Sequence, residues 1–563
     1  MEKNVDLLNL FKEKKYSELI YIIEYELSES QKNLSVINLL GVSRLLQKER
    51  TTKDIALAIE NFKTVYLKEK KPEISSQAFR NFVNASADLY DLEKKSLNIE
   101  KAFDYFNQAL HIFSEKENYF LNDELVTLAI IRIYKRLVDI QKVKFYLEEL
   151  IRRKKFRPST ICSLMYHNLF FKNWTQQQFL DYGKILDKNL TKYSDQNLVP
   201  ISHNTNHKMQ IGFLSSDIKT KHSITYFLKT ITDNYDKNKI SINLYFNHMK
   251  SQEDDTTEEF IKSVDKSIYI DHLSDEDAVN LIRKDKNDIL IDLMGVTSKS
   301  RLSLIKNRLA PTQILWCGYC NTTGVEEMDY ILADKNLIFE NEKNLYKEKI
   351  IYLPKIWNCH SGINLQRSFT ESPFIKNRYI TFGSFNNFSK INDSVIYTWS
   401  KIIKSVKGSK LILKTSNLKS QTLLIQKFKK ENILDSVEFE PYKKNFKDHM
   451  SLYRKIDLAL DTFPHTGVTT SFEAIWMGVP VLTMKGYNFH SRCGESINKN
   501  LDTNWLSAKN ENEYVLKAKE LSEKNDILID LRKSIYDKAI SSPLFDTKSF
   551  TSDFFKTLES IKK

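Results

Sequence analysis

The residues best suited to chemistry lie in the segment 457–478, DLALDTFPHTGVTTSFEAIWMG. An apolar strand pattern ends there at Asp461, a turn with a proline and a glycine follows, and a helical pattern begins at about Thr469 or Thr470. The first N–H groups of a helix have no internal acceptor, and the helix dipole is positive there, so this turn can hold a diphosphate. The threonine hydroxyls would add donors, although Thr-Thr-Ser is equally typical of helix capping.

Two other groups also suggest chemistry. Glu473, one turn into that helix, could accept hydrogen bonds from a ribose diol or could only favour the helix dipole. The spacing of Cys317 and Cys320, with Cys359 followed by His360, raises the possibility of zinc coordination. A closed zinc site usually shows a second well-spaced pair, however, and Cys317 ends an apolar run. The sequence therefore favours buried, reduced thiols.

Two successive sets of short apolar strands, separated by helical stretches such as residues 275–285, must position these residues. Continuous apolar strands that alternate with helices indicate parallel sheets covered on both faces, and such sheets bind ligands at the carboxyl ends of their strands. Neither GxGxxG nor a P-loop lysine motif occurs, which counts against a dehydrogenase or an ATPase. The predicted strands are 209–214, 240–246, 267–270, 289–294, 314–316 and 330–333, and then 379–385, 410–413, 437–439, 458–461 and 479–483.

The first 150 residues differ, with helical spacing of apolar positions and almost no glycine. A self-comparison gives a 44-residue period, with a weaker third copy around Ala129 and Leu150. Small residues at such places let two helices approach closely, which predicts a helical solenoid similar to tetratricopeptide repeats rather than an ordinary bundle. The recurring positions are Gly41, Ala58, Phe62 and Val65, matched by Ala85, Ala102, Phe106 and Ala109.

Composition sets the class of protein. The chain has 563 residues, too many for one core, with 41% hydrophobic and 28% charged residues, as in folded water-soluble proteins. The net charge of +13 comes from lysines scattered among acidic residues, so nucleic-acid binding is not expected. A signal peptide and membrane spans are also not expected, and the sparse, odd set of five cysteines fits a cytoplasmic protein.

The segment 457–478 resembles the nucleotide-binding signature of the O-GlcNAc transferase and SPINDLY family, glycosyltransferase family forty-one. The resemblance covers most of residues 208–555, in family order, through IGFLSSD, DILIDLMGVTSKSRL, LAPTQILWCGYCNTTGVEEMDYILAD, YKEKIIYLP, ITFGSFNNFSKI and ISSPLFDTKSFT. It implies tetratricopeptide-like repeats followed by a GT-B fold of two Rossmann-like lobes, an α plus α/β chain. The expected domains are a helical repeat (1–155), a helical linker (156–207) that ends near His203 to His207, an N-terminal lobe (208–372) and a C-terminal, nucleotide-sugar-binding lobe (373–563).

The resemblance also implies residue roles. In the second lobe it assigns the nucleotide sugar to Asn386, Lys390, His449, Thr469, Thr470 and Glu473, with Lys390 also catalytic. In the first lobe it aligns His222 with an active-site histidine and Asp217 with the acid before it. The family pattern places three residues between that acid and histidine, whereas this chain has four. Each position has a plainer alternative as a surface or structural side chain.

The expected reaction is an inverting transfer of a sugar, GlcNAc foremost, from a nucleotide diphosphate sugar to Ser or Thr hydroxyls of proteins that bind the helical repeats. Phe446 stands where animal O-GlcNAc transferases have a lysine, and SFNNFSK is closer to the SPINDLY branch, so the resemblance leaves UDP-GlcNAc, GDP-fucose and UDP-glucose open, the last with asparagine as acceptor. No cofactor or metal is expected, because Asp254 and Asp255 lie in a polar acidic run and the family needs none. A non-catalytic repeat scaffold that senses a nucleotide sugar, and a carbohydrate or lipid-linked acceptor, stay as alternatives.

Overall fold

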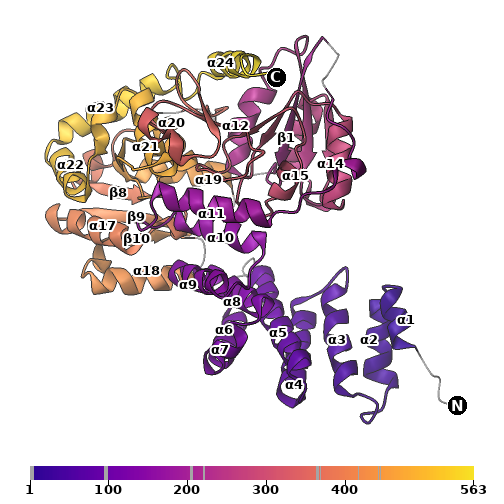
Figure 1. The fold of residues 1–563 in the computed structure, drawn as a ribbon. Coiled ribbons are helices and arrows are strands. Elements are labelled where there is room, and N and C mark those ends of the chain that lie inside the picture. Colours follow the sequence, from indigo (N-terminus) through magenta and orange to yellow (C-terminus); the bar gives the residue numbers. More distant parts are fainter. Residues whose placement is uncertain are drawn as a thin grey trace. The chain divides into compact units, whose positions relative to one another are not determined.

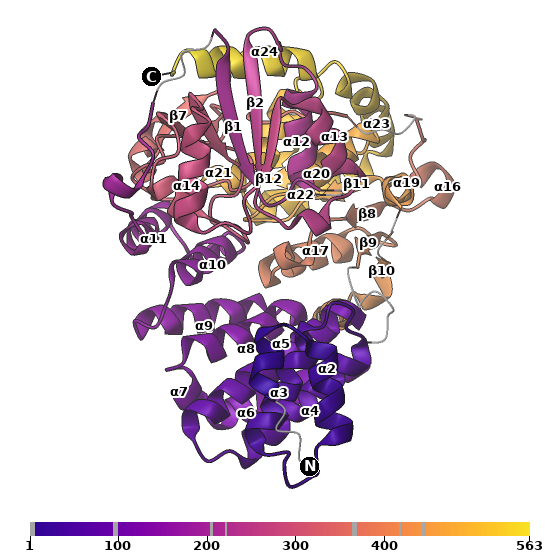
Figure 2. The ribbon, with the colours of Figure 1, turned by 90° about the vertical axis from the view of Figure 1, so that its right-hand side faces the viewer.

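The computed structural model describes residues 6–93, 99–202, 207–219, 222–362, 367, 369–415, 418–441, 443 and 445–562. The chain forms two compact units, Met1–Phe156 and Arg157–Lys563 (Figures 1 and 2). In the part of the chain that the structure describes, we find no helix with the length and apolar character of a membrane span. The predicted linker residue His203 lies outside the described residues.

The first unit is a stack of antiparallel helices. Three helix pairs follow the 44-residue period: α3 with α4, α5 with α6, and α8 with α9. Asn33, Thr51, Asp123 and Asp139 cap four of these helices through their side chains, so the sequence marks where each begins. The helices are α1 (Leu7–Lys12), α2 (Tyr16–Tyr21), a π-helix (Ile22–Glu26), α3 (Leu34–Leu46), α4 (Thr52–Lys68), α5 (Pro72–Glu93), α6 (Glu100–Glu115), α7 (Glu117–Phe120), α8 (Glu124–Leu137) and α9 (Ile140–Arg152).

The recurring small and aromatic residues of the period pack where the sequence analysis placed them. Phe62 and Phe106 are fully buried, as are the recurring alanines Ala58 and Ala102. At Gly41 an added Cβ atom would lie 2.8 Å from the Phe62 ring, so only a glycine lets α3 approach α4 this closely. The prediction of a helical repeat is confirmed.

The second unit contains two parallel sheets. The first lobe has the order β3-β2-β1-β4-β5-β6-β7, with α14 on one side of the sheet and α12 and α13 on the other (Figure 2). Its strands are β1 (Met209–Ser215), β2 (Ile240–Phe246), β3 (Lys266–Tyr269), β4 (Ile289–Asp292), β5 (Thr312–Leu315), β6 (Tyr330–Ala333) and β7 (Lys349–Tyr352). Its helices are α12 (Ser223–Thr232), α13 (Asp255–Ser263), α14 (Asp275–Lys284) and α15 (Leu302–Lys306).

The second lobe repeats this topology, with the order β10-β9-β8-β11-β12-β13. Its strands are β8 (Thr381–Ser384), β9 (Lys410–Lys414), β10 (Val437–Glu440), β11 (Leu458–Leu460), β12 (Val481–Met484) and β13 (Ser507–Ala508). Its helices are α16 (Phe374–Asn377), α17 (Asp393–Ser405), α18 (Leu418–Lys430), α19 (Phe446–Ser451), α20 (Thr469–Trp476), α21 (Phe489–Asn500), α22 (Glu511–Glu523) and α23 (Asn525–Ala539). The strands β7 and β13 were not predicted, and β13 is only two residues long.

Two segments cross the limits expected from the sequence. Helices α10 (Pro158–Asn168) and α11 (Gln176–Asn189) fall in the expected linker, but they belong to the second unit. The last helix, α24 (Thr547–Glu559), follows the second lobe in sequence yet packs on the first. There Thr551 Oγ1 donates to the Thr230 carbonyl (3.0 Å), and the Phe554 ring lies 4.9 Å from Trp316. The chain therefore returns to its first lobe at its end.

Candidate functional site

The N-terminus of α20 is the centre of the candidate site. Val468 precedes the helix and supplies no side-chain cap. Among the described residues, the backbone N–H groups of Thr469 and Thr470 have no hydrogen-bond acceptor. The helix therefore presents free donors at its positive end, and the capping interpretation of Thr-Thr-Ser is not supported.

Asp461, just after β11, shapes the turn before this helix. It is buried, and its carboxylate accepts hydrogen bonds from the Gly467 N–H (2.6 Å) and from Thr483 Oγ1 (2.7 Å). Burial raises the pKa of Asp461 to about 6, against these hydrogen bonds and the charge of Lys390. At Gly467 an added Cβ atom would lie 2.7 Å from Thr470 Oγ1, so a glycine is required for the turn to close on the helix.

Lys390 and Asn386 reach the same helix end from the loop after β8. Lys390 Nζ donates to the Thr466 carbonyl at 2.8 Å. Burial lowers the pKa of Lys390, and the nearby Asp461 opposes that shift. Asn386 Oδ1 accepts from Thr470 Oγ1 at 2.9 Å. Three of the residues that the sequence nominated thus gather around the free donors of α20.

Glu473 and His449 form a second, buried pair. His449 Nε2 donates to Glu473 Oε2 at 3.0 Å, and Tyr453 OH donates to the same oxygen at 2.9 Å. Within the described residues Glu473 Oε1 has no hydrogen-bond partner, and neither has the buried Nδ1 of His449. Burial alone would raise the pKa of Glu473, but the hydrogen bond and charge of His449 hold that pKa below its usual value. An ionised acceptor and an unsatisfied imidazole nitrogen are therefore available to a ligand.

Lys414 was missed in the sequence. It is the last residue of β9, at the carboxyl edge of the sheet, and its charge acts on Glu473. Burial lowers the pKa of Lys414, against the attraction of Glu473. Its position at the end of the apolar run KLIL was the available signal, because ligands of such sheets bind at that edge.

Asp217 and His222 lie in the first lobe and are less tightly held. His222 precedes α12, and its Nδ1 accepts from the Ile224 N–H at 3.4 Å while Nε2 lies 3.7 Å from Asp217 Oδ1. Burial lowers the pKa of His222, whereas the charge of Asp217 raises it. The structure brings these two residues together, but residues 220 and 221, which carry the extra spacing, lie outside the described part.

Aromatic rings connect α12 with the second lobe. Tyr226, one turn after His222, stacks on the buried His360 with ring centroids 4.6 Å apart. The same ring lies 6.1 Å from Phe446 of α19. Burial lowers the pKa of His360 to about 4, so the imidazole is neutral. The sequence analysis missed Tyr226 and its stacking on His360, although Tyr226 lies in the first turn of α12, four residues after His222.

The cysteines and the acidic run have structural places. All five cysteines lie in described parts of the chain, and none forms a disulfide. Among the described residues, no three His, Cys, Asp or Glu side chains gather as metal ligands would. Cys162, Cys359 and Cys493 are buried, as expected, whereas Cys317 and Cys320 are half-buried. Desolvation raises the pKa of the Cys317 thiol well above its usual value. Asp254 accepts from the Thr257 N–H (3.1 Å) and so caps α13.

The sequence was compared with models of known protein families. The model of glycosyl transferase family 41 matches residues 175–377 and 372–554, most of the second unit. The chain belongs to glycosyl transferase family 41. The family resemblance stated from the sequence is thereby confirmed.

Two plant proteins are similar in sequence to this chain. A Hordeum vulgare protein named probable UDP-N-acetylglucosamine–peptide N-acetylglucosaminyltransferase SPINDLY is 35% identical over 352 residues, 61% of this chain and 37% of that protein. The Solanum lycopersicum protein of the same name is 32% identical over 396 residues, 68% of this chain and 41% of that protein. The chain thus spans about two fifths of the length of these relatives.

A solved structure shares the architecture of this family 41 chain. A mutant of Thermobaculum terrenum O-GlcNAc transferase aligns with a TM-score of 0.78 over 95% of this chain and 98% of that chain, at 20% identity. At this identity the likeness shows the fold alone. The predicted fold class, a helical repeat followed by a GT-B fold of two Rossmann-like lobes, is confirmed.

Proposed function

We propose that this family 41 chain is an inverting glycosyltransferase that moves a sugar from a nucleotide diphosphate sugar to hydroxyl groups of proteins. The observation that carries the proposal is the N-terminus of α20, whose free N–H groups lie beside the Lys390 ammonium, Asn386 and the Thr470 hydroxyl. Developing charge on a departing diphosphate is stabilised best by fixed donors in a site that excludes water.

The reaction would proceed in one displacement. A lone pair of the acceptor oxygen forms a bond to the anomeric carbon while the bond from that carbon to the diphosphate oxygen breaks, and the electron pair leaves with the diphosphate. Thr469, Thr470 and Lys390 would receive that charge. The acceptor proton would pass to the pair of Asp217 and His222. His222 Nε2 lies 3.7 Å from Asp217 Oδ1, and its Nδ1 lies 3.4 Å from the Ile224 nitrogen, so both contacts are long enough to rearrange when substrate binds.

The nucleotide would extend from this helix end toward β9 and α19. In this proposal Glu473 Oε1 accepts from a ribose hydroxyl, while His449 Nδ1 and Lys414 contact the base; the partners of Glu473 Oε2 and the unsatisfied Nδ1 of His449 support it. All of these groups belong to the protein, so we propose that the diphosphate is held without a metal ion. Donor turnover that is unchanged by a chelator would support this, and turnover that depends on added Mg²⁺ would contradict it.

GlcNAc is the first candidate sugar, because the relatives carry the name of N-acetylglucosaminyltransferases. GDP-fucose is a second candidate, favoured by Phe446, an apolar ring where the animal enzymes have a lysine. UDP-glucose is a third. The helical repeats of the first unit would recruit acceptor proteins.

The test is to incubate the purified protein with UDP-GlcNAc, GDP-fucose and UDP-glucose separately and to measure nucleotide release. Mass spectrometry of acceptor proteins then identifies the added sugar and whether it sits on Ser, Thr or Asn. Release from one donor with a matching mass increment on protein is expected. Binding of a donor without release of nucleotide or transfer would favour the scaffold that only senses a nucleotide sugar.

A further inference from the structure

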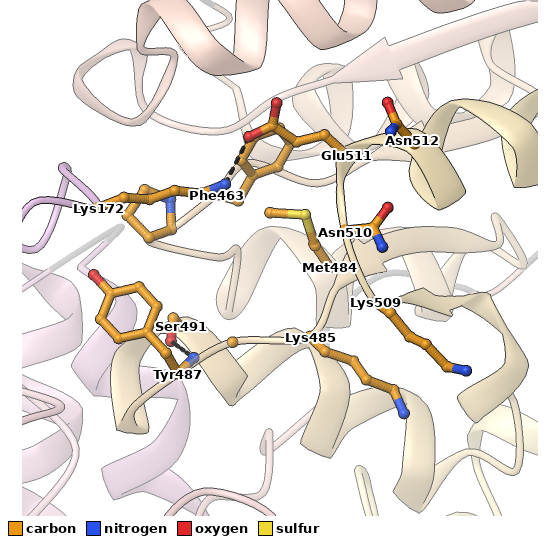
Figure 3. Close-up of a pocket in the computed structure, with 12 residues that line it drawn as sticks. Lys172, Phe463, Met484, Lys485, Tyr487, Ser491, Lys509, Asn510, Glu511 and Asn512 are labelled. Carbon is orange, nitrogen blue, oxygen red and sulfur yellow. Dashed lines mark hydrogen bonds and ion pairs between the residues drawn. The ribbon is translucent and has the colours of Figure 1, made fainter.

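A cavity of about 560 Å³ opens at the carboxyl ends of β11, β12 and β13 (Figure 3). Its walls come from the loop after β11, the turn between β12 and α21, the residues that begin α22, and Lys172 of the loop between α10 and α11. In strand order Asn386 and Lys390 follow β8 and Lys414 ends β9, whereas the cavity lies at β11, β12 and β13, toward the other end of the same sheet edge. None of the roles assigned above uses it.

The cavity wall is cationic. It carries Lys172, Lys485 and Lys509 against one carboxylate, Glu511. Glu511 is already engaged, because it accepts from Lys172 Nζ (2.6 Å) and Ser394 Oγ (2.8 Å). Although burial alone would raise it, these hydrogen bonds hold the pKa of Glu511 below its usual value, so it stays ionised. Two lysines of the wall are therefore left to attract a negatively charged ligand.

Those two lysines are exposed and extend in the same direction (Figure 3). Lys485 Nζ lies 3.9 Å from Glu495, the limit of an ion pair. Lys509 has no carboxylate within ion-pair distance among the residues that the structure describes. Both ammonium groups can therefore exchange water for a carboxylate at little cost.

The rest of the wall favours a peptide over a phosphate. Phosphate sites use free backbone N–H groups, but Ser491 Oγ here accepts from the N–H groups of Tyr487 (2.9 Å) and Asn488 (3.0 Å). At the start of α22, the Asn510 side chain likewise accepts from the Glu513 N–H (3.0 Å). What the cavity lining offers instead is the two flexible ammonium groups of Lys485 and Lys509 together with the apolar side chains of Phe463, Pro464 and Met484. This combination suits an extended chain with acidic side chains.

The cavity shares a loop with the proposed catalytic residues. Phe463 and Pro464 line it, and the carbonyl of Thr466 in the same loop accepts the hydrogen bond from Lys390. A chain bound in the cavity would therefore lie one loop away from the leaving diphosphate. We propose that this cavity binds an acidic segment of the acceptor protein, close in sequence to the residue that receives the sugar. This inference rests on the proposed function and adds a preference for acidic acceptors.

The test uses two fluorescein-labelled peptides that share a Ser/Thr-rich stretch and differ in the flanking segment, one with Asp and Glu and the other with Asn and Gln. Their anisotropy is titrated with the full chain in the presence of UDP at low salt. The wild-type protein should bind the acidic peptide about tenfold more tightly, as expected for two exposed ion pairs. Lys485→Glu combined with Lys509→Glu should remove that preference. The matched control is Lys548→Glu with Lys556→Glu, an equal change in charge on two exposed lysines of α24, and it should keep the preference.

Equal affinity of the two peptides for the wild-type protein would overturn the inference, as would a preference that survives the Lys485/Lys509 variant. Displacement of both peptides alike by inorganic phosphate would also count against it, because it would indicate a general anion site. Circular dichroism of each variant verifies its fold. Nucleotide release by the wild-type protein is measured separately, so a failed glycosyltransferase assignment is distinguished from a failed acceptor site.

Discussion

In the second lobe the proposed donor-binding side chains are held by buried hydrogen bonds, whereas in the first lobe His222 is 40% exposed at its side chain and lies 3.7 Å from Asp217. Glu473, for example, receives hydrogen bonds from both His449 and Tyr453. In the first lobe the tightly packed side chain is Tyr226, one helical turn after His222, which stacks on the fully buried His360.

This difference indicates a division of labour within the proposed site. A preorganised second lobe can grip a nucleotide diphosphate without rearrangement, and fixed dipoles stabilise charge most effectively when they need not reorient. The looser pair in the first lobe would adopt its working geometry only when the donor and acceptor are bound, as is common for catalytic hydrogen bonds in ligand-free enzymes. Substitutions in the two halves should therefore have different kinetic consequences.

The largest effect is expected at Lys390. Lys390→Ala should lower kcat for transfer about a thousandfold, because it removes a fixed cation beside the departing diphosphate. Thermal unfolding should change little, since the lost hydrogen bond to the Thr466 carbonyl contributes only about 1 kcal/mol. Single-turnover measurements with saturating donor give the comparison with wild type.

The matched control is Lys548→Ala, which removes an exposed lysine of α24. It should leave kcat unchanged. If Lys390→Ala retained wild-type turnover, Lys390 of the second lobe would not stabilise the leaving diphosphate. The proposed division of roles between the two lobes would then be wrong.

A smaller effect, on stability, is expected from His360. Its folded pKa of about 4 lies below its ordinary value of 6.5, so the unfolded chain binds more protons between these values. Stability is fully present above pH about 6.5 and is lost as the pH falls toward 4, by on the order of 3 kcal/mol. His360→Asn keeps an acceptor for the Gly362 N–H and should remove this part of the acid sensitivity.

Urea unfolding at a series of pH values measures the difference between wild type and His360→Asn. The control is His272→Asn, a change at a histidine whose side chain is 66% exposed, which should leave the pH dependence as in wild type. If the free energy of unfolding depended on pH in the same way for wild type and His360→Asn, His360 would not be the buried group whose protonation destabilises the fold.

The sequence predicted the second-lobe half well and the contacts between the lobes poorly. Thr470 could be found from its place after an apolar strand and a turn, and Asn386 and Lys390 through the family resemblance; the topology of the sheet brings all three to one edge. Tyr226 of the first lobe lies 6.1 Å from Phe446 of the second lobe, and within the first lobe it stacks on His360, 134 positions away in the chain. No local pattern marks such contacts.

Local patterns also do not show how the end of the chain packs. The helix α24 reads as an ordinary amphipathic helix after the second lobe, and only its packing against Trp316 and Thr230 shows that it covers the first. The cationic cavity had no signal either, because Lys172, Lys485 and Lys509 come from three separate loops in a chain rich in scattered lysines. Tertiary assembly, not composition, creates that surface.

The smallest of the three effects is expected at the loosely held pair. His222→Ala should lower kcat about a hundredfold, the usual contribution of a positioned proton acceptor. Affinity for the donor, measured by calorimetry, should stay as in wild type, because the second lobe supplies the contacts to the nucleotide. Asp217→Asn should cost less than His222→Ala, since the carboxylate is separated from the ring by 3.7 Å and acts mainly by orienting it. A loss of donor affinity as large as the loss of kcat would instead show that His222 contributes to donor binding. The first and second lobes would then share that role.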